Sequence, residues 1–292
     1  MLPINGWLNI YKPVGISSAG LVGRVKKILG RVKIGHTGTL DVEAEGVLPL
    51  AIGEATKLVQ FLIEAKKSYR FKVQFGACTD TGDRAGKILR TTEHIPTKQE
   101  TIDICEKFIG IISQIPPAFS ALKISGRPAY KLARSGQEVN LKPRNIEIFN
   151  LKMESYDPDA KTAIYYAECS KGTYIRTLAE DISLSLQSLG FVLELARTRV
   201  GAFEAITALK PTALVELSAE AILQDLQKIE VVLADILVFD IDVDTALKVR
   251  HGKKIPIEHK DVERIWLRAD SKILAIGSIR NGYFNSARVL NI

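Results

Sequence analysis

The 292-residue chain has few of the residues that build disulfide frameworks and metal sites. Its three cysteines, Cys78, Cys105 and Cys169, lie far apart and form no C-x-x-C pair. An odd count at such spacing argues against a disulfide framework and against a structural zinc site. The four histidines show no i, i+3 or i, i+4 pairing either. We therefore expect no bound metal.

Long apolar runs are also missing, since no stretch approaches the roughly 20 residues that a spanning helix needs. The first residues show no basic segment followed by an apolar one, so we expect no signal peptide. A content of 46 % hydrophobic and 25 % charged residues is typical of a globular protein. The chain is long enough for one large domain, or for a large domain and a small one. We expect a cytoplasmic protein that does not enter membranes.

Acidic residues are absent from the first forty positions, and Asp41 is the first carboxylate in the chain. It closes a loop rich in glycine and threonine, GHTGTLD at residues 35–41. A basic environment suits a polyanionic ligand, and a single carboxylate within it is better suited to reaction than to binding. The six bases that precede it are Lys12, Arg24, Lys26, Lys27, Arg31 and Lys33.

The net charge of +7 is unevenly distributed. Residues 211–245 carry a local charge of −7, so the remainder must sum to +14. This asymmetry indicates a polyanionic partner, and nucleic acid fits better than a membrane because no amphipathic basic helix dominates. The alternative, a basic protein with an acidic linker, is not decided by charge alone. The segment has one base, Lys228, and eight acids: Glu216, Glu220, Asp225, Glu230, Asp235, Asp240, Asp242 and Asp244.

The hydrophobic pattern predicts strands that cluster and helices that interrupt them, without a βαβ repeat, which favours an α+β fold. A helix is expected from Ser17 or Ser18 to residue 29, with Gly30 as its C-cap. The other expected helices are residues 54–64, 99–112 and 172–189, the last ended by Gly190. The expected strands are residues 6–11, 46–52, 67–76, 144–156, 161–171 and 191–203.

Residues 114–148 form an unusual segment with turn residues, tyrosine and spaced cations. From residue 119 to 148 it holds six bases, among them Lys123 and Arg134, and two acids. This composition predicts a protruding hairpin–helix arm that contacts phosphates, with a merely solvated loop as the alternative.

The C-terminal residues 237–292 are expected to form a small β-rich module docked on a main body of residues 1–236. Strand patterns lie at residues 262–267, 273–279 and 287–290. About fifty residues are marginal for a free-standing domain, so docking is the better interpretation.

Taken alone, the loop at 35–41 has two ordinary interpretations. One is a tight strand-to-helix turn in which Asp41 is the helix N-cap. The other is an H-x-x-x-x-D spacing, in which Asp41 would orient His36 as a general base in an acyltransferase. Nothing else in the chain supports the second.

Read with its surroundings, the loop resembles the signature of the bacterial tRNA pseudouridine-55 synthases, the TruB family. Residues 12–18 are similar to the family's K-P-x-G-x-[ST]-S motif. Val42 departs from the family, which usually has proline there, and its presence loosens the backbone without removing a reacting group. The matching blocks span residues 6–203 and are 12–18, 35–57, 67–69, 79–83, 114–130, 172–176 and 195–203.

The resemblance implies a catalytic role for Asp41, as a nucleophile that attacks uridine at C6 or C1′. It implies that Arg176 holds Asp41 charged and aimed, although Arg176 could instead pair with Glu180 one helical turn away. Tyr69 would stack on the flipped base. The alternation of apolar and polar residues in its strand, taken alone, instead predicts a tyrosine buried in the core.

Further RNA and substrate contacts are implied for six residues. Tyr174 and Leu195 would line the uridine pocket, His36 would contact RNA, and Lys12 would support the pocket or a phosphate. Lys123 and Arg134 would contact RNA from the arm. The isomerisation is redox-neutral, so neither a metal nor a cofactor is implied.

The function implied is isomerisation of uridine to pseudouridine at position 55 in the TΨC loop of tRNA. The fold implied is α+β: a pseudouridine-synthase catalytic domain with a mixed, largely antiparallel sheet, an inserted RNA-binding arm and a small PUA-like β domain. The partner would be the T-arm stem-loop of tRNA, bound by a monomer without an obligate protein partner. Two alternatives stay open: a guide-RNA-dependent synthase, and an RNA-binding tRNA chaperone without chemistry.

Overall fold

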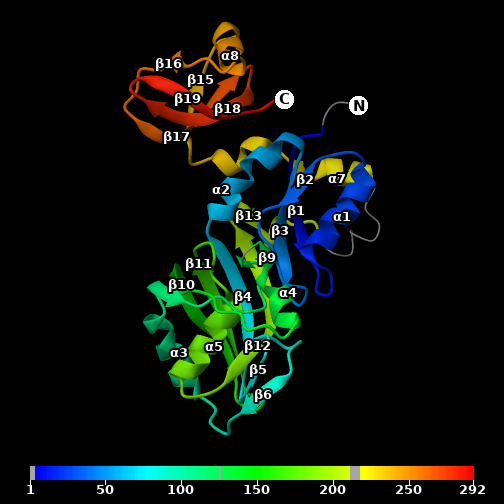
Figure 1. Ribbon diagram of the computed structural model, residues 1–292, viewed down its shortest axis with the longest axis vertical. Helices are drawn as coiled ribbons and strands as arrows, with labels where there is room; N and C mark the ends of the chain where they lie inside the picture. Colours follow the sequence, from blue (N-terminus) through cyan, green and yellow to red (C-terminus); the bar gives the residue numbers. More distant parts are fainter. Residues whose placement is uncertain (1–3, 125, 211–217) are drawn as a thin grey trace.

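The computed structural model describes residues 4–124, 126–210 and 218–292, which form a large sheet and a smaller one (Figure 1). Ser125 of the expected arm and Glu216 of the acidic segment lie outside these residues. The strands of the main body are β1 (Gly6–Lys12), β2 (Ile34–His36), β3 (Glu45–Ile52), β4 (Lys67–Phe75), β5 (Ala77–Thr79), β6 (Ile88–Thr91), β7 (Gly110–Gln114), β8 (Lys123–Ile124), β9 (Arg127–Pro128), β10 (Arg144–Asp157), β11 (Thr162–Cys169), β12 (Gly190–Val200), β13 (Phe203–Glu204) and β14 (Leu226–Gln227). The C-terminal strands are β15 (Leu237–Asp240), β16 (Ile255–Pro256), β17 (Val262–Ala269), β18 (Lys272–Arg280) and β19 (Tyr283–Val289).

Short helices connect these strands. The α-helices are α1 (Ser18–Leu29), α2 (Val59–Glu64), α3 (Lys98–Lys107), α4 (Ala129–Arg134), α5 (Ile175–Ser185), α7 (Ala219–Gln224) and α8 (Val243–Arg250). Three 3₁₀ turns are η1 (Gly53–Leu58), η2 (Ala205–Thr207) and η3 (Ile229–Leu233).

The large sheet has the strand order β14-β1-β3-β12-β4-β11-β10-β7, with β2 beside β3 and β13 beside β12. Its described pairs are antiparallel except β3 with β12, which run parallel. The predicted α+β fold with a mixed, largely antiparallel sheet is therefore confirmed. The parallel pair matters most for the site, because it brings the loop before β3 beside the middle of β12.

One face of this sheet carries both α1 and α5 (Figure 1). Tyr69 on β4 lies opposite Arg197 on β12, which lies opposite Gly46 on β3. Because side chains alternate along a strand, Leu48 and Leu50 share the face of Tyr69 and Arg197. Helix α1 packs on the two leucines, and α5 packs around β4. Tyr69 and Arg197 thus lie between the two helices.

Helix α1 begins and ends as predicted. Ser17 is its N-cap and accepts a hydrogen bond from the backbone N–H of Gly20 at 3.0 Å. Gly30 ends it with φ of 77°, a left-handed conformation that glycine adopts without steric cost.

Two expected helices end earlier in the structure. The helix predicted for 99–112 is α3, which stops at Lys107, and Ile112 instead lies in β7 opposite Ile146. Isoleucines at 109, 111 and 112 fit the periodicity of a helix or of a strand, and the segment forms a strand because it pairs with β10. The helix predicted for 172–189 starts at Ile175 and ends at Ser185. Gly190 begins β12 instead of capping the helix.

The remaining boundaries differ in smaller ways. The helix predicted for 54–64 is divided into η1 and α2. The segment expected as an arm leaves the sheet only between β7 and β10, because Gln114 and residues 144–148 belong to those two strands. Between them lie the β8–β9 hairpin and α4, as the turn and helix signals predicted.

The C-terminal strands form a five-stranded sheet in the order β15-β17-β18-β19-β16. It contacts the main body at α2, where Arg264 of β17 pairs with Glu64 at 2.7 Å. Beneath this pair, Trp266, Ile273 and Leu290 share an apolar cluster with Leu62 of α2. The last strand starts at Tyr283, four residues before the predicted position, since Asn281 and Gly282 form the turn.

Candidate active site

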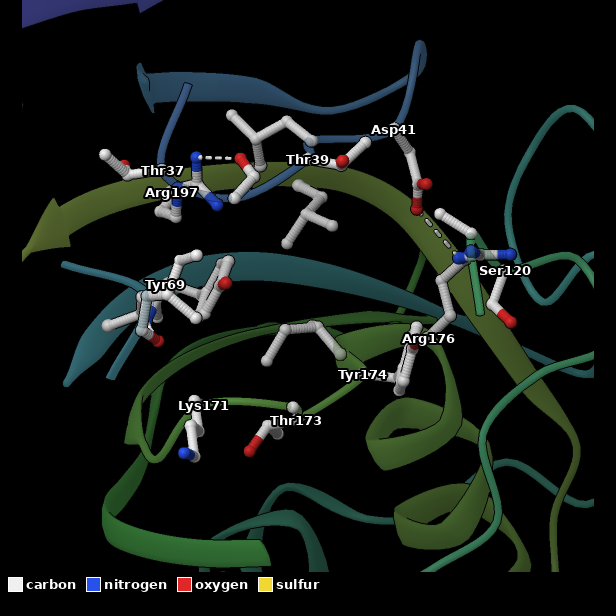
Figure 2. Close-up of a pocket in the computed structure, with 18 of the residues that line it drawn as sticks. Thr37, Thr39, Asp41, Tyr69, Ser120, Lys171, Thr173, Tyr174, Arg176 and Arg197 are labelled. Carbon is white, nitrogen blue, oxygen red and sulfur yellow. Dashed lines mark hydrogen bonds and ion pairs between the residues drawn. The ribbon is translucent and has the colours of Figure 1, made fainter. Parts of the chain in front are cut away.

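A cavity of about 440 Å³ opens on the face of the sheet that carries α5 (Figure 2). Its walls come from the loop after β2, from β4 and β12, from the turn before α5 and from the base of the arm. Six of the nine predicted site residues line it: His36, Asp41, Tyr69, Tyr174, Arg176 and Leu195. Lys12, Lys123 and Arg134 do not line it.

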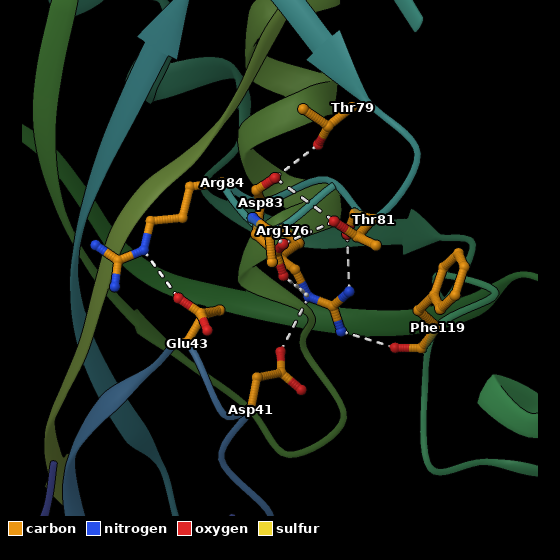
Figure 3. Close-up of polar contacts among 9 residues, drawn as sticks. Asp41, Glu43, Thr79, Thr81, Asp83, Arg84, Phe119 and Arg176 are labelled. Carbon is orange, nitrogen blue, oxygen red and sulfur yellow. Dashed lines mark hydrogen bonds and ion pairs between the residues drawn. The ribbon is translucent and has the colours of Figure 1, made fainter. Parts of the chain in front are cut away.

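Asp41 and Arg176 form an ion pair, with 3.0 Å between Nε of the arginine and Oδ2 of the aspartate (Figure 3). The Arg176 side chain is only 6 % exposed, whereas that of Asp41 is 45 % exposed. Nη1 donates to the Thr81 carbonyl and Nη2 to the Phe119 carbonyl, both at 2.8 Å. A buried guanidinium with a partner on each of its three nitrogens therefore holds an accessible carboxylate in one orientation.

Both simpler interpretations of this pair are wrong. Asp41 is followed by a turn and then by β3, so it is not a helix N-cap. Arg176 pairs with Asp41 and, at 3.9 Å, with Asp83; in the described part of the chain it forms no ion pair with Glu180. Asp83 comes from residues 79–83, one of the blocks that resemble the family, but the sequence predicted no role for it.

The loop that carries Asp41 is fixed on both sides of the aspartate. The Ser18 hydroxyl accepts from the Leu40 N–H at 2.9 Å and donates to the Leu40 carbonyl at 3.1 Å. The Gly15 N–H donates to the Val42 carbonyl at 2.8 Å. Proline at position 42 would offer the same carbonyl, so the departure at Val42 leaves this contact unchanged.

Lys12 has a supporting position rather than a binding one. Its side chain is completely buried, and burial lowers its pKa to about 8. The ammonium donates to the carbonyls of Pro13 at 2.9 Å and Ile16 at 2.8 Å. Lys12 thus holds residues 13–16, and Gly15 within this segment donates to the Val42 carbonyl.

Tyr69 belongs both to the core and to the cavity wall. It is 9 % exposed, and burial raises the pKa of its hydroxyl. Arg197 lies directly opposite on β12 and is 2 % exposed, and its positive charge opposes part of this increase in the pKa. Sequence reasoning gave Arg197 no role, because a cation in an alternating strand has no local signal that distinguishes it.

His36 lines the cavity without forming a dyad with Asp41. Burial, with Arg197 nearby, lowers the pKa of His36 below its ordinary value. Its Nδ1 accepts from the Gly38 N–H at 3.4 Å, and no hydrogen bond joins it to Asp41 among the described residues. The imidazole is neutral at pH 7 and is engaged within its own loop.

Gln114 fixes the turn that carries Tyr174. Its side chain donates to the Tyr174 carbonyl at 3.1 Å and accepts from the Tyr174 N–H at 2.8 Å. Burial raises the pKa of the Tyr174 hydroxyl, and Leu195 faces the same cavity from β12. Gln114 was placed in the arm by its sequence, and its function in positioning Tyr174 was missed.

Lys123 and Arg134 are exposed on the arm, on β8 and at the end of α4. The Arg134 guanidinium lies 5.8 Å from the centre of the Tyr130 ring. The arm reaches the cavity only at its base, through Ser120, Ala121 and Leu122. The two cations therefore face solvent beyond the cavity.

Across residues 4–124, 126–210 and 218–292, no group of three or more His, Cys, Asp or Glu side chains is arranged to hold a metal ion. No helix in these ranges is long and apolar enough to span a membrane.

Solved structures identify the class of fold. The chain superposes with a TM-score of 0.73 on a chain from the crystal structure of a Cbf5-Nop10-Gar1 complex, covering 98 % of this chain and 84 % of that one at 24 % identity. A chain from an H/ACA RNP bound to a substrate RNA containing 2′-deoxyuridine gives a TM-score of 0.74, covering 98 % and 85 % at 21 % identity. At these identities the likeness shows the fold.

Sequence comparison is more specific. Residues 26–175 match the model of the TruB family pseudouridylate synthase, N-terminal domain. The tRNA pseudouridine synthase B of Rickettsia bellii is 58 % identical over 287 residues, 98 % of each chain. That of Rickettsia akari is 54 % identical over 290 residues, 99 % of each chain. The chain belongs to the TruB family of pseudouridylate synthases.

Proposed function

We propose that the protein isomerises uridine to pseudouridine at position 55 in the TΨC loop of tRNA. The observation that carries the proposal is the Asp41–Arg176 ion pair at the edge of a cavity of about 440 Å³. Relatives that are more than half identical over nearly the whole chain are named tRNA pseudouridine synthase B, which supports tRNA as the substrate.

The reaction breaks the bond between C1′ and N1 of uridine, rotates the base and joins C1′ to C5. Asp41 is the nucleophile, which attacks C6 or C1′, and the Arg176 guanidinium keeps it ionised and aimed. The uridine must leave its stack to reach the cavity, where Tyr69 stacks on the base and Tyr174 and Leu195 form the walls. His36 contacts the RNA that surrounds the flipped nucleotide.

The arm, with Lys123 and Arg134, binds the phosphates of the T-arm stem-loop. Residues 237–292 are a PUA-like domain that adds RNA contacts to a catalytic domain of residues 1–236, whose RNA-binding insertion is residues 114–148. The protein acts as a monomer in the cytoplasm, where tRNA is available. Two exposed cations on a segment beside the cavity, which form no ion pair with the described residues, support this placement of the stem-loop.

The two alternatives are less well supported. A guide-RNA-dependent synthase would share this fold, and the superposed chains do come from ribonucleoprotein or multiprotein complexes. The arm, however, gives this chain its own means of holding a stem-loop. A chaperone without chemistry has no need for an accessible carboxylate pinned by a buried arginine.

The test is incubation of the purified protein, without guide RNA or other protein, with unmodified tRNA made by transcription. We expect pseudouridine at position 55 alone, and none in a matched tRNA with cytidine at that position. Turnover that requires an added RNA or protein would favour the guide-dependent alternative. Binding without any pseudouridine would leave only the chaperone.

A further inference from the structure

Two buried arginines line the cavity, and their partners differ sharply. Arg176 pairs with two carboxylates, Asp41 and Asp83. Arg197 is 2 % exposed, yet among the described residues no carboxylate oxygen lies within 4.0 Å of it. A buried charge without a counter-ion is costly, so its retention requires a compensating partner.

The protein groups around Arg197 use only part of its donor capacity. Nε donates to the Val47 carbonyl at 2.8 Å, and Nη2 donates to the Gly38 carbonyl at 3.0 Å. A guanidinium has five N–H groups, so about three have no acceptor among the described residues. A buried lysine in the same cavity wall, Lys67, donates to the carbonyls of Leu62, Ile63 and Ala65, so it adds positive charge and removes none.

A second polar group at the same end of the cavity also lacks a partner. Thr37 is 1 % exposed, and its hydroxyl has no hydrogen-bond partner among the described residues. Figure 2 shows Thr37, Arg197 and Tyr69 together at one end of the cavity, with Asp41 and Arg176 at the other. Gly38 borders this end as well, since a Cβ at this position would be in van der Waals contact with Nη1 of Arg197 at 3.6 Å.

Because Arg197 is buried at this end of the cavity, only some parts of a nucleotide can reach it. A phosphate is joined on both sides to the chain and keeps its hydration, so it cannot reach a guanidinium that is 2 % exposed. A flat base stacked on Tyr69 can, and its carbonyl oxygens are acceptors. The acceptor that Arg197 lacks is thus an oxygen of the uracil ring.

We propose that Arg197 is a further catalytic residue, which stabilises the negative charge that develops on the uracil ring during isomerisation. The proposal rests on the proposed function. Preorganised donors aimed at developing charge in a water-poor site are a major source of rate enhancement.

Attack at either carbon places negative charge on the uracil ring. If Asp41 attacks C1′, the C1′–N1 electron pair leaves with the ring and is delocalised over N1, O2 and O4. If Asp41 attacks C6, the C5–C6 pair moves to C5 and O4. In either case C5 finally bonds to C1′ and loses its proton, N1 gains a proton, and the carboxylate is released. Arg197 donates hydrogen bonds to the ring oxygen while it carries this charge and transfers no proton.

The experiment compares uridine with 5-fluorouridine at the target position of a T-arm RNA, because fluorine withdraws electrons and stabilises the anionic ring. Arg197→Gln removes the charge and keeps a donor near the position of Nε, which donates to the Val47 carbonyl, whereas Arg197→Lys keeps the charge. We measure the single-turnover rate of target-nucleoside consumption and the RNA dissociation constant. For Arg197→Gln we expect a loss of about 10²- to 10³-fold with uridine, a clearly smaller loss with 5-fluorouridine, and little change in affinity. Arg197→Lys should recover part of the uridine rate.

The matched control is Arg199→Gln, on the same strand but exposed, where Nε donates to the Gly201 carbonyl. It should leave both rates unchanged. Equal losses with the two substrates would overturn the proposal, since a structural role slows both alike, and so would an unchanged uridine rate. If Arg197→Gln does not fold, Arg197→Lys provides the test: a loss of rate with uridine that is smaller with 5-fluorouridine supports the proposal, and an equal loss with both substrates overturns it. Failure of wild type to convert uridine would refute the proposed function itself.

Discussion

Ser18 and Leu40, 22 positions apart in the chain, are joined by two hydrogen bonds through a single hydroxyl. The hydroxyl is both acceptor for the Leu40 N–H and donor to the Leu40 carbonyl, and both residues are buried. Because Asp41 is the next residue, this clamp sets the point from which its carboxylate projects. Leu40 is thereby fixed independently of the Arg176 contact at the far end of the aspartate side chain.

Ser18→Ala should therefore lower kcat by about 10- to 100-fold, because small displacements of a reacting group have effects of this size. It should also lower the free energy of unfolding by about 1–3 kcal/mol, since both backbone groups of Leu40 lose their partner. The control is Ser17→Ala, which removes the N-cap of α1 at a cost of about 1 kcal/mol and should leave kcat unchanged. Equal kcat losses in the two variants would mean that general destabilisation explains them.

Asp41→Asn should abolish pseudouridine formation, with a loss of about 10⁴-fold or more, while tRNA binding stays nearly unchanged. Phosphate contacts dominate affinity for RNA, and the amide keeps the shape of the side chain. Glu43→Gln is the matched control, because Glu43 lies two residues away and is also paired with an arginine, Arg84, at 2.9 Å. Turnover retained by Asp41→Asn in a pseudouridine assay would contradict the nucleophile assignment.

The sequence placed most strands correctly because alternation and turn residues are local signals. It misplaced the end of α3 because isoleucines at 109 and 112 satisfy a helical period, and only the pairing of β7 with β10 decides between the two. A strand partner thirty residues away is invisible to a local pattern. The same limit explains why Gly190 was expected to cap α5 when it starts β12.

For the site, the hydrophobic periodicity could not predict that Asp41 and Arg176 lie close together. Only the resemblance of several motif blocks to the family predicted this pair. The predicted pair is present at 3.0 Å. The motifs did not predict the contacts that position the site residues. These contacts are the hydrogen bonds of Ser18 with Leu40 and of Gln114 with Tyr174, and the position of Arg197 opposite Tyr69. These contacts depend on which strands become neighbours, and the parallel pairing of β3 with β12 has no local signal in the sequence.

Gly46→Ala should destabilise the protein by about 2–3 kcal/mol or more, because two separate costs fall on one residue. Its φ is 113°, and a Cβ would lie 2.2 Å from the Arg197 carbonyl oxygen across the parallel β3–β12 pair. Gly23→Ala is the control in mid-helix, where a Cβ meets nothing within 4 Å and stability should rise by about 0.5–1 kcal/mol. Urea unfolding of both variants checks the prediction, and a mild effect at Gly46 would mean that the two strands can separate.

Glu180 should make stability depend on pH. Burial, followed by the neighbouring Asp181, raises the pKa of Glu180 from 4.5 to about 7. The folded protein then holds a proton between pH 4.5 and 7 that the unfolded chain releases, so this contribution to stability is present below pH 4.5 and is lost as pH rises to about 7.

Glu180→Gln keeps the neutral form at every pH. It should match wild type near pH 4.5 and exceed it by about 1–3 kcal/mol at pH 8, as measured by urea unfolding. Glu106→Gln, an exposed glutamate on α3, is the control and should follow wild type throughout. A constant difference between Glu180→Gln and wild type across this range would contradict the prediction.

Lys123 and Arg134 should contribute to RNA affinity and not to the chemical step. Both are exposed on the arm and neither lines the cavity, so they can neutralise phosphates without touching the flipped base. Each phosphate contact on a duplex contributes about 0.9 to the slope of log K against log salt, and about 0.7 on a single strand. The double variant Lys123→Gln/Arg134→Gln should therefore reduce that slope by about 1.5 while kcat at saturating tRNA stays unchanged.

The control is the double variant Lys98→Gln/Lys107→Gln, which removes two exposed cations of α3 and changes the net charge equally. It should leave the slope unchanged if the arm is the binding surface. Equal reductions in the two double variants would show that net charge, rather than the arm, holds the RNA.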